Sequence, residues 1–293
     1  MTILLLCREE TLDVKSISTE LKAHGYEVIV SPPQDILVWC NKGKNEFFYK
    51  QNRIDISCVI GWVSLHQREY GMWLLKAFEI SGIPIINSSD VLEIGQNKFL
   101  NSVILNQYNI PHVSTFLVGN VSQLEKVMNE LKFPVVLKPI VGAKGDKVIR
   151  VDDKNALKNI VPFYMSNNKP LYIQSHINKP GRDIRVRVID FKAEYAFYRN
   201  AKSGEFLTNL STGGTWNECE LTPELKVLAE KCSKVFNSPI AGVDIVEDEN
   251  ENYAILEVNT TPAVTYPRDE TVYLVVELIE KVLKKSAIPV KSF

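Results

Sequence analysis

Residues 253–264 read YAILEVNTTPAV and begin as a β-strand that carries two polar side chains. Ile255 and Val258 are apolar, as expected of a strand that packs on a core. Glu257 and Asn259 are two residues apart, and side chains two apart on a strand point to the same face. The strand therefore directs a carboxylate and an amide toward one place.

The preceding segment, AGVDIVEDENEN at residues 241–252, predicts a β-hairpin whose turn is the polar run 247–252. If Asp244 faces Glu257, the midpoint between them falls inside that turn, and Asp244, Glu257 and Asn259 come together. Three oxygen donors suit Mg2+ that is held partly by protein and partly by substrate phosphates. A hairpin with a solvent-facing carboxylate edge would show the same short pattern, so the rest of the chain has to separate the two interpretations.

The composition is that of a globular protein with room for two domains or one large α/β unit. The chain has 293 residues, of which 45% are hydrophobic and 24% charged, and its net charge is -1. We predict no nucleic-acid partner, because there is no basic field, and no membrane span, because no apolar run reaches roughly eighteen residues. Five scattered cysteines without a CxxC pair indicate reduced thiols and a cytoplasmic location.

The chain changes character near residue 110. Before it, strands and helices alternate, which predicts a small parallel sheet in a Rossmann-like domain, although no G-x-G-x-x-G follows the first strand. One linking helix is expected from the capping candidates at Ser88 to the residue before Pro111. We predict a first domain at 1–90, a linker helix at 91–110, a subdomain with lid and hinge at 111–178, and a subdomain with the metal and substrate site at 179–293.

Cationic groups that could meet phosphates occur in two segments. Lys138 ends the strand VVLKP, and the next loop, VGAKGDK at residues 141–147, could lay backbone N–H groups against phosphate oxygens and close as a lid. Further on, RDIRVRV places Asp183, Arg185 and Arg187 on one face of a strand, opposite apolar residues. We expect Arg185 to neutralise a transferring phosphoryl group, and Arg187 to be solvated or ion-paired.

These motifs, taken in order, resemble the ATP-grasp carboxylate–amine ligases, and within them the RimK-like branch. That branch includes ribosomal-protein glutamate ligases, glutamate ligases acting on pterin or deazaflavin coenzymes, and the lysine-biosynthesis ligases that charge a carrier protein. The resemblance covers about residues 85–285 and is carried by Lys98, VVLKP, GAKG, LYIQSHI, GRDIRVRVI, FYRNAKSGEFLTNLSTGG, LTPEL, AGVDI and ILEVNTTPAV. It implies an α/β (α+β) ATP-grasp fold behind a Rossmann-like pre-ATP-grasp domain.

The resemblance also implies a role for each matching residue. ATP would be bound by Lys98, Lys138, Gly142, Lys144, Gly145, Gln174, Ser175, His176, Ile177, Asp183 and Asn209. The segment 174–177 would be the hinge whose backbone pairs with adenine. Arg185 would stabilise the transition state that forms the acyl phosphate, and Arg199 would help bind the substrate carboxylate. Asp244, Glu257 and Asn259 would hold Mg2+, with Mn2+ as an alternative ion.

The expected function is therefore ATP-dependent, ADP-forming amide or peptide bond formation through an acyl phosphate. An amino acid such as glutamate would be added to an amine or carboxylate acceptor, which could be a coenzyme, a peptide or a carrier protein. A homodimer or homotetramer is expected from the same resemblance. Two alternatives stay open: a non-catalytic ATP-binding regulatory protein and an ATP-grasp small-molecule kinase.

The loop GWVSLHQREYG, at residues 61–71, is a further candidate site. It carries Ser64, His66 and Arg68 after a sheet strand, where open α/β sheets usually bind ligands. We hypothesise that it shapes the acceptor site, and an Arg68→Ala variant with unchanged acceptor affinity would contradict this.

Overall fold

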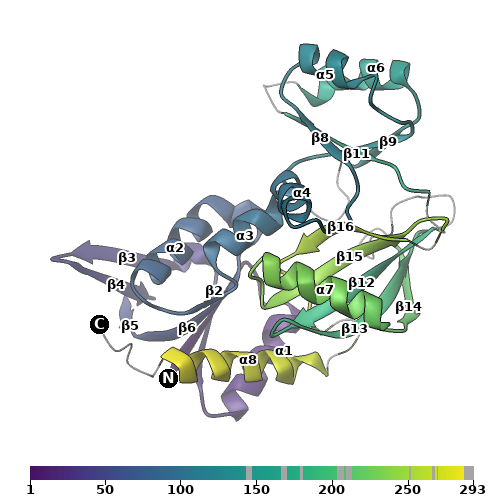
Figure 1. The fold of residues 1–293 in the computed structure, drawn as a ribbon. Coiled ribbons are helices and arrows are strands. Elements are labelled where there is room, and N and C mark those ends of the chain that lie inside the picture. The colour runs from purple at the N-terminus through teal and green to yellow at the C-terminus, as the bar shows by residue number, and fades with distance from the viewer. Residues whose placement is uncertain are drawn as a thin grey trace, which may run out of the picture.

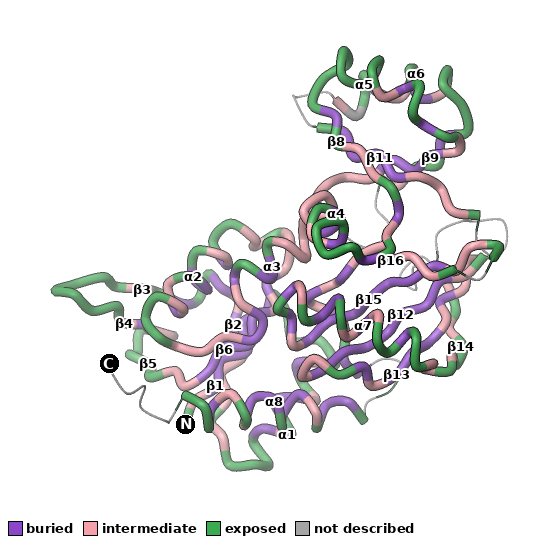
Figure 2. Tube along the Cα trace, in the orientation of Figure 1, coloured by how far each residue is buried: buried purple, intermediate pink, exposed green. Residues whose placement is uncertain are grey.

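The computed structural model describes residues 1–142, 147–165, 170–178, 181–202, 208, 213–250, 252–265, 268 and 270–286. In this part of the chain the strands form four sheets, and the sheet that contains β8, β9 and β11 stands apart from the others (Figure 1). The strands of the larger sheets are mostly buried, whereas the β3–β4 arm is largely exposed (Figure 2). Every described helix falls short of the length and apolar content that crossing a bilayer requires.

The first sheet is parallel and has the strand order β2-β1-β6-β7, which confirms the predicted small parallel sheet. Its strands are β1 (Thr2–Cys7), β2 (Glu27–Ser31), β6 (Ile56–Trp62) and β7 (Ile85–Ile86), and its helices are α1 (Leu12–Ala23) and α2 (Arg68–Ile80), the latter preceded by the short 3-10 helix η2 (Leu65–Gln67). Thr11 caps α1 by accepting a hydrogen bond from the Val14 N–H. The face with Ile17 and Leu21 then packs on the sheet.

A small antiparallel sheet, which was not predicted, projects from this domain as an arm (Figure 1). It follows the 3-10 helix η1 (Pro33–Asp35) and consists of β3 (Ile36–Asn41), β4 (Lys44–Tyr49) and β5 (Asn52–Ile54). The turn between β3 and β4 has Lys42 and Gly43 at positive φ, 49° and 75°. Lysine is an unusual residue for the first of these positions, so the sequence gives only a weak hairpin signal here.

The single linking helix expected between Ser88 and Pro111 is wrong, because the chain forms two helices there. They are α3 (Ser89–Gln96) and α4 (Lys98–Gln107). Asn97 separates them with an extended backbone, and its side chain accepts hydrogen bonds from the N–H groups of Phe99 and Leu100. An asparagine that caps a new helix from within a polar Q-N-K run explains the break.

The second sheet is antiparallel, with the strand order β10-β9-β11-β8. Its strands are β8 (Thr115–Val118), β9 (Val135–Lys138), β10 (Ile149–Val151) and β11 (Leu171–Ser175), and its helices are α5 (Val121–Val127) and α6 (Lys154–Tyr164). Apolar side chains from both helices and all four strands form one core under the sheet. The unit has its own core, which allows it to behave as a separate body.

The third sheet is antiparallel, has the order β14-β13-β12-β15-β16 and carries most of the predicted site. Its strands are β12 (Arg182–Ile189), β13 (Lys192–Asn200), β14 (Thr215–Cys219), β15 (Ile240–Glu247) and β16 (Tyr253–Asn259). α7 (Pro223–Val235) covers one face, where its residues Leu225 and Ala229 pack on Ile184 and Val186. This confirms the predicted apolar back of the sheet.

The last helix, α8 (Thr271–Ser286), returns to the first sheet. It lies beside α1 (Figure 1), and its apolar face packs with residues of β1, β6 and α1 in one core. Val275, Val276 and Ile279 are at most 1% exposed, as their helical spacing predicts. The chain therefore uses its C-terminal helix to complete the core of its N-terminal domain.

The buried thiols are expected to resist alkylation. Burial raises the pKa of Cys58 and of Cys232 to about 12 and that of Cys7 to about 11, whereas Cys40 is exposed. Because the thiolate is the reactive form, we expect iodoacetamide at pH 8 to modify Cys40 about 10^3-fold faster than Cys58 or Cys232. Mass spectrometry of timed samples measures this, with a urea-denatured sample as the control in which all sites react; comparable rates in the native protein would contradict the prediction.

Candidate active site

The hairpin of β15 and β16 has the predicted register. Asp244 is paired with Glu257, and Gly242 is paired with Asn259, with a bulge just beyond Asp244. Directly paired residues of antiparallel strands lie on the same face, so both carboxylates and the Asn259 amide share one face. Val243 and Val258, which point to the other face, are fully buried. The polar and apolar alternation read from the sequence therefore matches the two faces of the sheet.

The polar face continues onto β12. Arg185 is paired with Asp244 across the strands, and Arg187 is paired with Gly242. A Cβ atom added to Gly242 would lie 2.8 Å from Arg185 Nη1, so the glycine leaves the space that this guanidinium occupies. Any larger residue at position 242 would displace Arg185.

Arg187 was expected to be solvated or ion-paired. It is not solvated, because only 2% of the residue is exposed. It donates a hydrogen bond from Nε to the Tyr195 hydroxyl at 3.4 Å. Burial lowers the pKa of the guanidinium, and the nearby charge of Arg185 lowers it further. Arg187 is therefore a buried part of the polar face.

Asp244 lies at the centre of a buried network of charges. Arg185 donates to both of its oxygens, with an Nη2–Oδ2 distance of 2.8 Å, and Arg199 Nη2 lies 2.8 Å from the same Oδ2. Arg199 in turn donates to both oxygens of Asp183, at 2.7 and 2.9 Å, and the Thr208 hydroxyl also donates to Asp183. The network alternates acid and base, so each buried charge has an opposite partner.

The network explains the shifted pKa values of its members. Burial alone would raise the pKa of Asp244, but the charges of Arg185 and Arg199 outweigh burial and hold it below its usual value. Burial would lower the pKa of Arg199, but Asp244 and Asp183 outweigh it and raise it. Both groups therefore stay charged at neutral pH. Asp183 is 3% exposed and pairs with Arg199, and its predicted position near the nucleotide stays a prediction.

The donor set on this face fits a hard divalent cation. Asp244 and Glu257 supply carboxylates, and Asn259 supplies an amide oxygen, which now accepts a hydrogen bond from the Thr261 N–H at 2.9 Å. Oxygen donors of this kind are the ligands that Mg2+ prefers, with further positions left for water and phosphate. Among the described residues no cluster of three or more His, Cys, Asp or Glu side chains suits a metal, so the amide would have to complete the set.

Lys98 links the polar face to the second sheet. Its Nζ lies 3.8 Å from Glu257 Oε2 and donates to the Gly142 carbonyl at 2.8 Å. Its backbone N–H donates to the Ile140 carbonyl at 3.0 Å. Lys98 therefore sits between the metal-ligand candidates and the start of the predicted lid loop. Lys144 and Gly145 of that loop, and Asn209, lie outside the described residues.

Lys138 and the predicted hinge lie together in the second sheet. Lys138 Nζ donates to Gln174 Oε1 at 2.6 Å, and Gln174 is 3% exposed. The N–H of Ser175 donates to the Ser114 carbonyl and that of His176 to the Pro134 carbonyl, at 2.9 and 3.3 Å. These N–H groups already have protein partners, and the predicted adenine contacts of residues 174–177 stay predictions.

Some residues beside the site were not singled out from the sequence. Asp13, at the start of α1, accepts hydrogen bonds from the N–H groups of Val264 and Thr265 at 2.6 and 2.7 Å, and so holds the segment that follows Asn259. Asn87 and Asn101 are buried and contact the backbone next to Asn259. An acidic residue in a helical first turn and asparagines among apolar residues are weak signals, because such residues occur often without a function.

Residues 61–71, expected to form a loop, comprise the end of β6, the 3-10 helix η2 and the first turn of α2, and they are held by contacts within this segment and with α3. The Ser64 hydroxyl donates to Gln67 at 3.4 Å, and Arg68 pairs with Glu93 at 3.5 Å. These contacts fix the loop, and its role at the acceptor site stays a hypothesis.

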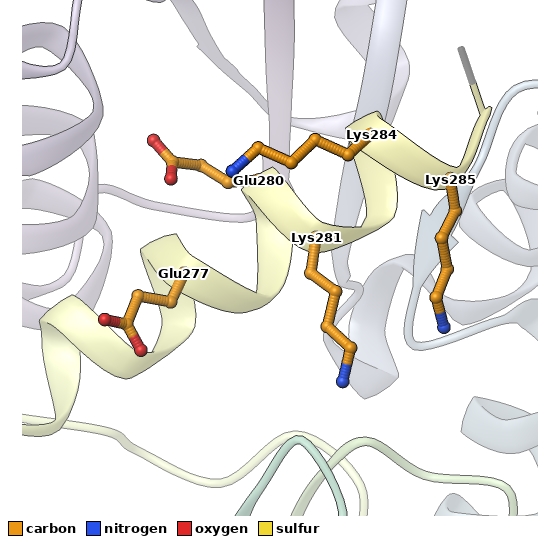
Figure 3. Close-up of a pocket in the computed structure, with 5 residues that line it drawn as sticks. All are labelled: Glu277, Glu280, Lys281, Lys284 and Lys285. Carbon is orange, nitrogen blue, oxygen red and sulfur yellow. The ribbon is translucent and has the colours of Figure 1, made fainter. Parts of the chain in front are cut away.

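The two described surface hollows lie away from the polar face. One, with a volume of about 470 Å³, is lined by Glu277, Glu280, Lys281, Lys284 and Lys285 on the exposed side of α8 (Figure 3). The other, of about 610 Å³, lies on the arm and includes Leu37 and Phe48. Lys281 donates a hydrogen bond to Asp190, which follows the end of β12 that is opposite to Asp183. Neither hollow is lined by a residue of the charged network.

Known proteins match this chain over nearly all of its length. A family model described as the RimK PreATP-grasp domain matches residues 1–92, and one described as the RimK-like ATP-grasp domain matches residues 95–282. The tetrahydromethanopterin:alpha-L-glutamate ligase of Methanosarcina acetivorans is 32% identical over 217 residues, 65% of this chain and 67% of that protein. The alpha-aminoadipate--LysW ligase LysX of Saccharolobus solfataricus is 29% identical over 254 residues, 85% of this chain and 88% of that protein.

Solved structures share the fold. The ATP-grasp ligase PsnB, complexed with a phosphomimetic variant of its minimal precursor, Mg and ADP, matches with a TM-score of 0.73 at 18% identity, over 96% of this chain and 98% of that chain. The match shows that the sheets described above have the ATP-grasp arrangement.

Proposed function

Because this chain belongs to the RimK-like ATP-grasp family of ligases, we propose that it spends ATP, with Mg2+, to join a carboxylate to an amine. The carrying observation is the pairing of Asp244 with Glu257, with Asn259 on the same face and Arg185 opposite Asp244. Two carboxylates, an amide and the Arg185 guanidinium, which binds both oxygens of Asp244, therefore lie in one patch. Such a patch suits the transfer of a phosphoryl group, where charge has to be neutralised and reactants aligned.

The proposed reaction has two steps. A carboxylate oxygen attacks the γ-phosphorus of ATP, ADP leaves, and an acyl phosphate forms. The nitrogen of an amine then attacks the acyl carbon, inorganic phosphate leaves, and the nitrogen loses a proton to give an amide. No protein nucleophile takes part, so the protein contributes by binding, orienting and excluding water.

Asp244, Glu257 and Asn259 would hold Mg2+, with Mn2+ as a substitute ion, and the bound ion would neutralise phosphate charge. Lys98 and Lys138 would contact phosphates from two sides, together with the loop residues Gly142, Lys144 and Gly145. The protein's own part in the first step is carried by Arg185 and Arg199. Their pairing with Asp244 holds both guanidinium groups in place before substrate arrives, and a preorganised cation needs little rearrangement during the reaction.

We propose an amino acid as one substrate, with glutamate as the first candidate. The relatives named above include a glutamate ligase that acts on tetrahydromethanopterin and a ligase that joins alpha-aminoadipate to LysW. The two names give different partners for the amino acid, so the acceptor proposed here stays open between a coenzyme, a peptide and a carrier protein. We also propose that the protein is a homodimer or homotetramer and that it is cytoplasmic. The domain division at residues 90, 110 and 178 likewise stays a proposal.

The test is a screen for ADP release with amino acids and amine or carboxylate acceptors. A ligase should release ADP and free phosphate only when both substrates are present, whereas a kinase would leave the phosphate on its product and a regulatory protein would release neither. Glu257→Ala should abolish the signal. Glu277→Ala is the matched control, because Glu277 points to solvent from α8 (Figure 3), and it should keep full activity.

A further inference from the structure

The strand that carries Glu257 and Asn259 lies at the edge of its sheet. Among the described residues β16 is the last strand in the order β14-β13-β12-β15-β16, and on its outer side Ile255 forms an isolated parallel bridge with His112. An edge strand leaves outward-facing N–H and C=O groups that need partners if they are buried. Val258, between the two metal-ligand candidates, is fully buried.

At Val258, three residues beyond that bridge, a side-chain amide takes the place of a neighbouring strand. Asn101 Nδ2 donates to the Val258 carbonyl, and the Val258 N–H donates to Asn101 Oδ1, both at 3.0 Å. Asn101 is 2% exposed. A pair of reciprocal hydrogen bonds fixes both the distance and the rotation of Val258 relative to α4, in a way that a single bond cannot.

The same helix carries Lys98. Lys98 is the first residue of α4, and its Nζ lies 3.8 Å from Glu257 Oε2. Lys98 and Asn101 are three residues apart, so they are neighbours on one side of the helix. One helical turn therefore connects the cation that would meet phosphate to the backbone between Glu257 and Asn259.

A second buried amide holds the chain just beyond Asn259. Asn87 Nδ2 donates to the carbonyls of Thr260 and Ile240, at 2.7 and 2.8 Å. α3 also packs closely here, since a Cβ atom on Gly95 would lie 2.1 Å from Thr260 Oγ1. The backbone is thus fixed on both sides of Asn259, by Asn101 before it and by Asn87 after it.

We propose that Asn101 is a positioning residue, which sets the spacing between Lys98 and the metal ligands Glu257 and Asn259; this rests on the function proposed above. Removing its amide frees Val258 and lets the two ligands shift relative to Lys98 and Asp244. Replacing residues that orient metal ligands typically lowers metal affinity or activity.

The experiment is a Mn2+ titration in the presence of ADP, with free Mn2+ followed by electron paramagnetic resonance. Asn101→Ala should bind Mn2+ about tenfold to hundredfold more weakly than the unaltered protein and lose a similar factor in kcat, with KM for carboxylate and amine unchanged. Asn101→Asp keeps the acceptor for the Val258 N–H but loses the donor to its carbonyl, and should also weaken Mn2+ binding.

Two controls separate positioning from stability. Asn106→Ala removes an exposed amide from the same helix and should change nothing. Leu105→Ala removes buried packing from the same helix but keeps the amide pair, and should keep Mn2+ affinity at temperatures where it is folded. Equal losses in Leu105→Ala and Asn101→Ala, or unchanged affinity in the Asn101 variants, would overturn the proposal.

The unaltered protein gives an independent check that needs no folded variant. The Val258 N–H should exchange with deuterium as slowly as amides inside β15, and exchange at the rate of an exposed edge would overturn the proposal. If the unaltered protein bound no Mn2+ with ADP and released no ADP with any substrate pair, the proposed function itself would fail. Metal binding and turnover in the unaltered protein, without an effect of Asn101, would remove the positioning role alone.

Discussion

Arg185→Lys is expected to lower kcat by about 10^2- to 10^3-fold. Arg185 donates hydrogen bonds to both oxygens of Asp244, with an Nη2–Oδ2 distance of 2.8 Å. The planar guanidinium group permits these two parallel bonds. Lysine keeps the charge but presents a single ammonium group, which cannot bind Asp244 and also face a phosphoryl oxygen in the same way. Initial rates of ADP release, with the substrate pair found in the screen, measure the loss.

Arg182→Lys is the matched control. Arg182 starts the same strand, pairs with Glu247 at 3.1 Å and stacks on Tyr198, and its side chain is 37% exposed. Its replacement should leave kcat within about twofold, because exposed ion pairs contribute little. Equal losses in both variants would mean that the effect comes from strand β12 as a whole and not from the Asp244 fork.

Asp244→Ala is expected to destabilise the protein by about 3–5 kcal/mol, because it leaves two buried guanidinium groups without their shared carboxylate. Arg185 and Arg199 are 9% and 7% exposed, so water cannot replace the lost partner. Urea unfolding, followed by circular dichroism, measures the shift. Glu247→Ala, on the same strand but paired with the partly exposed Arg182, should cost about 1 kcal/mol or less.

The same carboxylate gives the stability a definite pH dependence. Because the pKa of Asp244 is lowered in the folded protein, its contribution is complete above the ordinary carboxyl pKa of about 3.9 and is lost as the pH falls through the lowered value. The difference between the unaltered protein and Asp244→Ala should therefore be constant near neutral pH and shrink only in acid. A difference that shrinks between pH 6 and 8 would contradict this origin.

The hairpin register was predictable because it depends on local information. The polar run 247–252 fixes the turn, and the position of the turn sets which residues face one another. The pairing of Asp244 with Glu257 could therefore be predicted from the sequence. The alternation in RDIRVRV likewise gave the apolar and charged faces of β12. Periodicity and turn length act within about twenty residues, which is the range in which the sequence is most informative.

Other features depend on partners far away in the chain. Arg187 sits in the same alternation as Arg185, and this pattern does not distinguish a buried arginine from a solvated one; Asp13, far earlier in the chain, is among the charged groups near it. Asn101 looks like any polar residue in a helix until Val258, 157 residues later, supplies the other half of its amide pair. The break at Asn97 was missed because capping and continuing a helix differ by only about 1 kcal/mol.

The return of α8 to the first sheet affects how the protein can be made. A ribosome delivers β1, β2, β6 and α1 early, but the apolar surface that Val275, Val276 and Ile279 cover stays bare until the final helix emerges. Exposed surface of this kind attracts chaperones and other unfinished chains during synthesis. The N-terminal domain thus reaches its final form only after α8 has been synthesised, and a premature stop codon before residue 271 should yield insoluble product although every described strand has been translated.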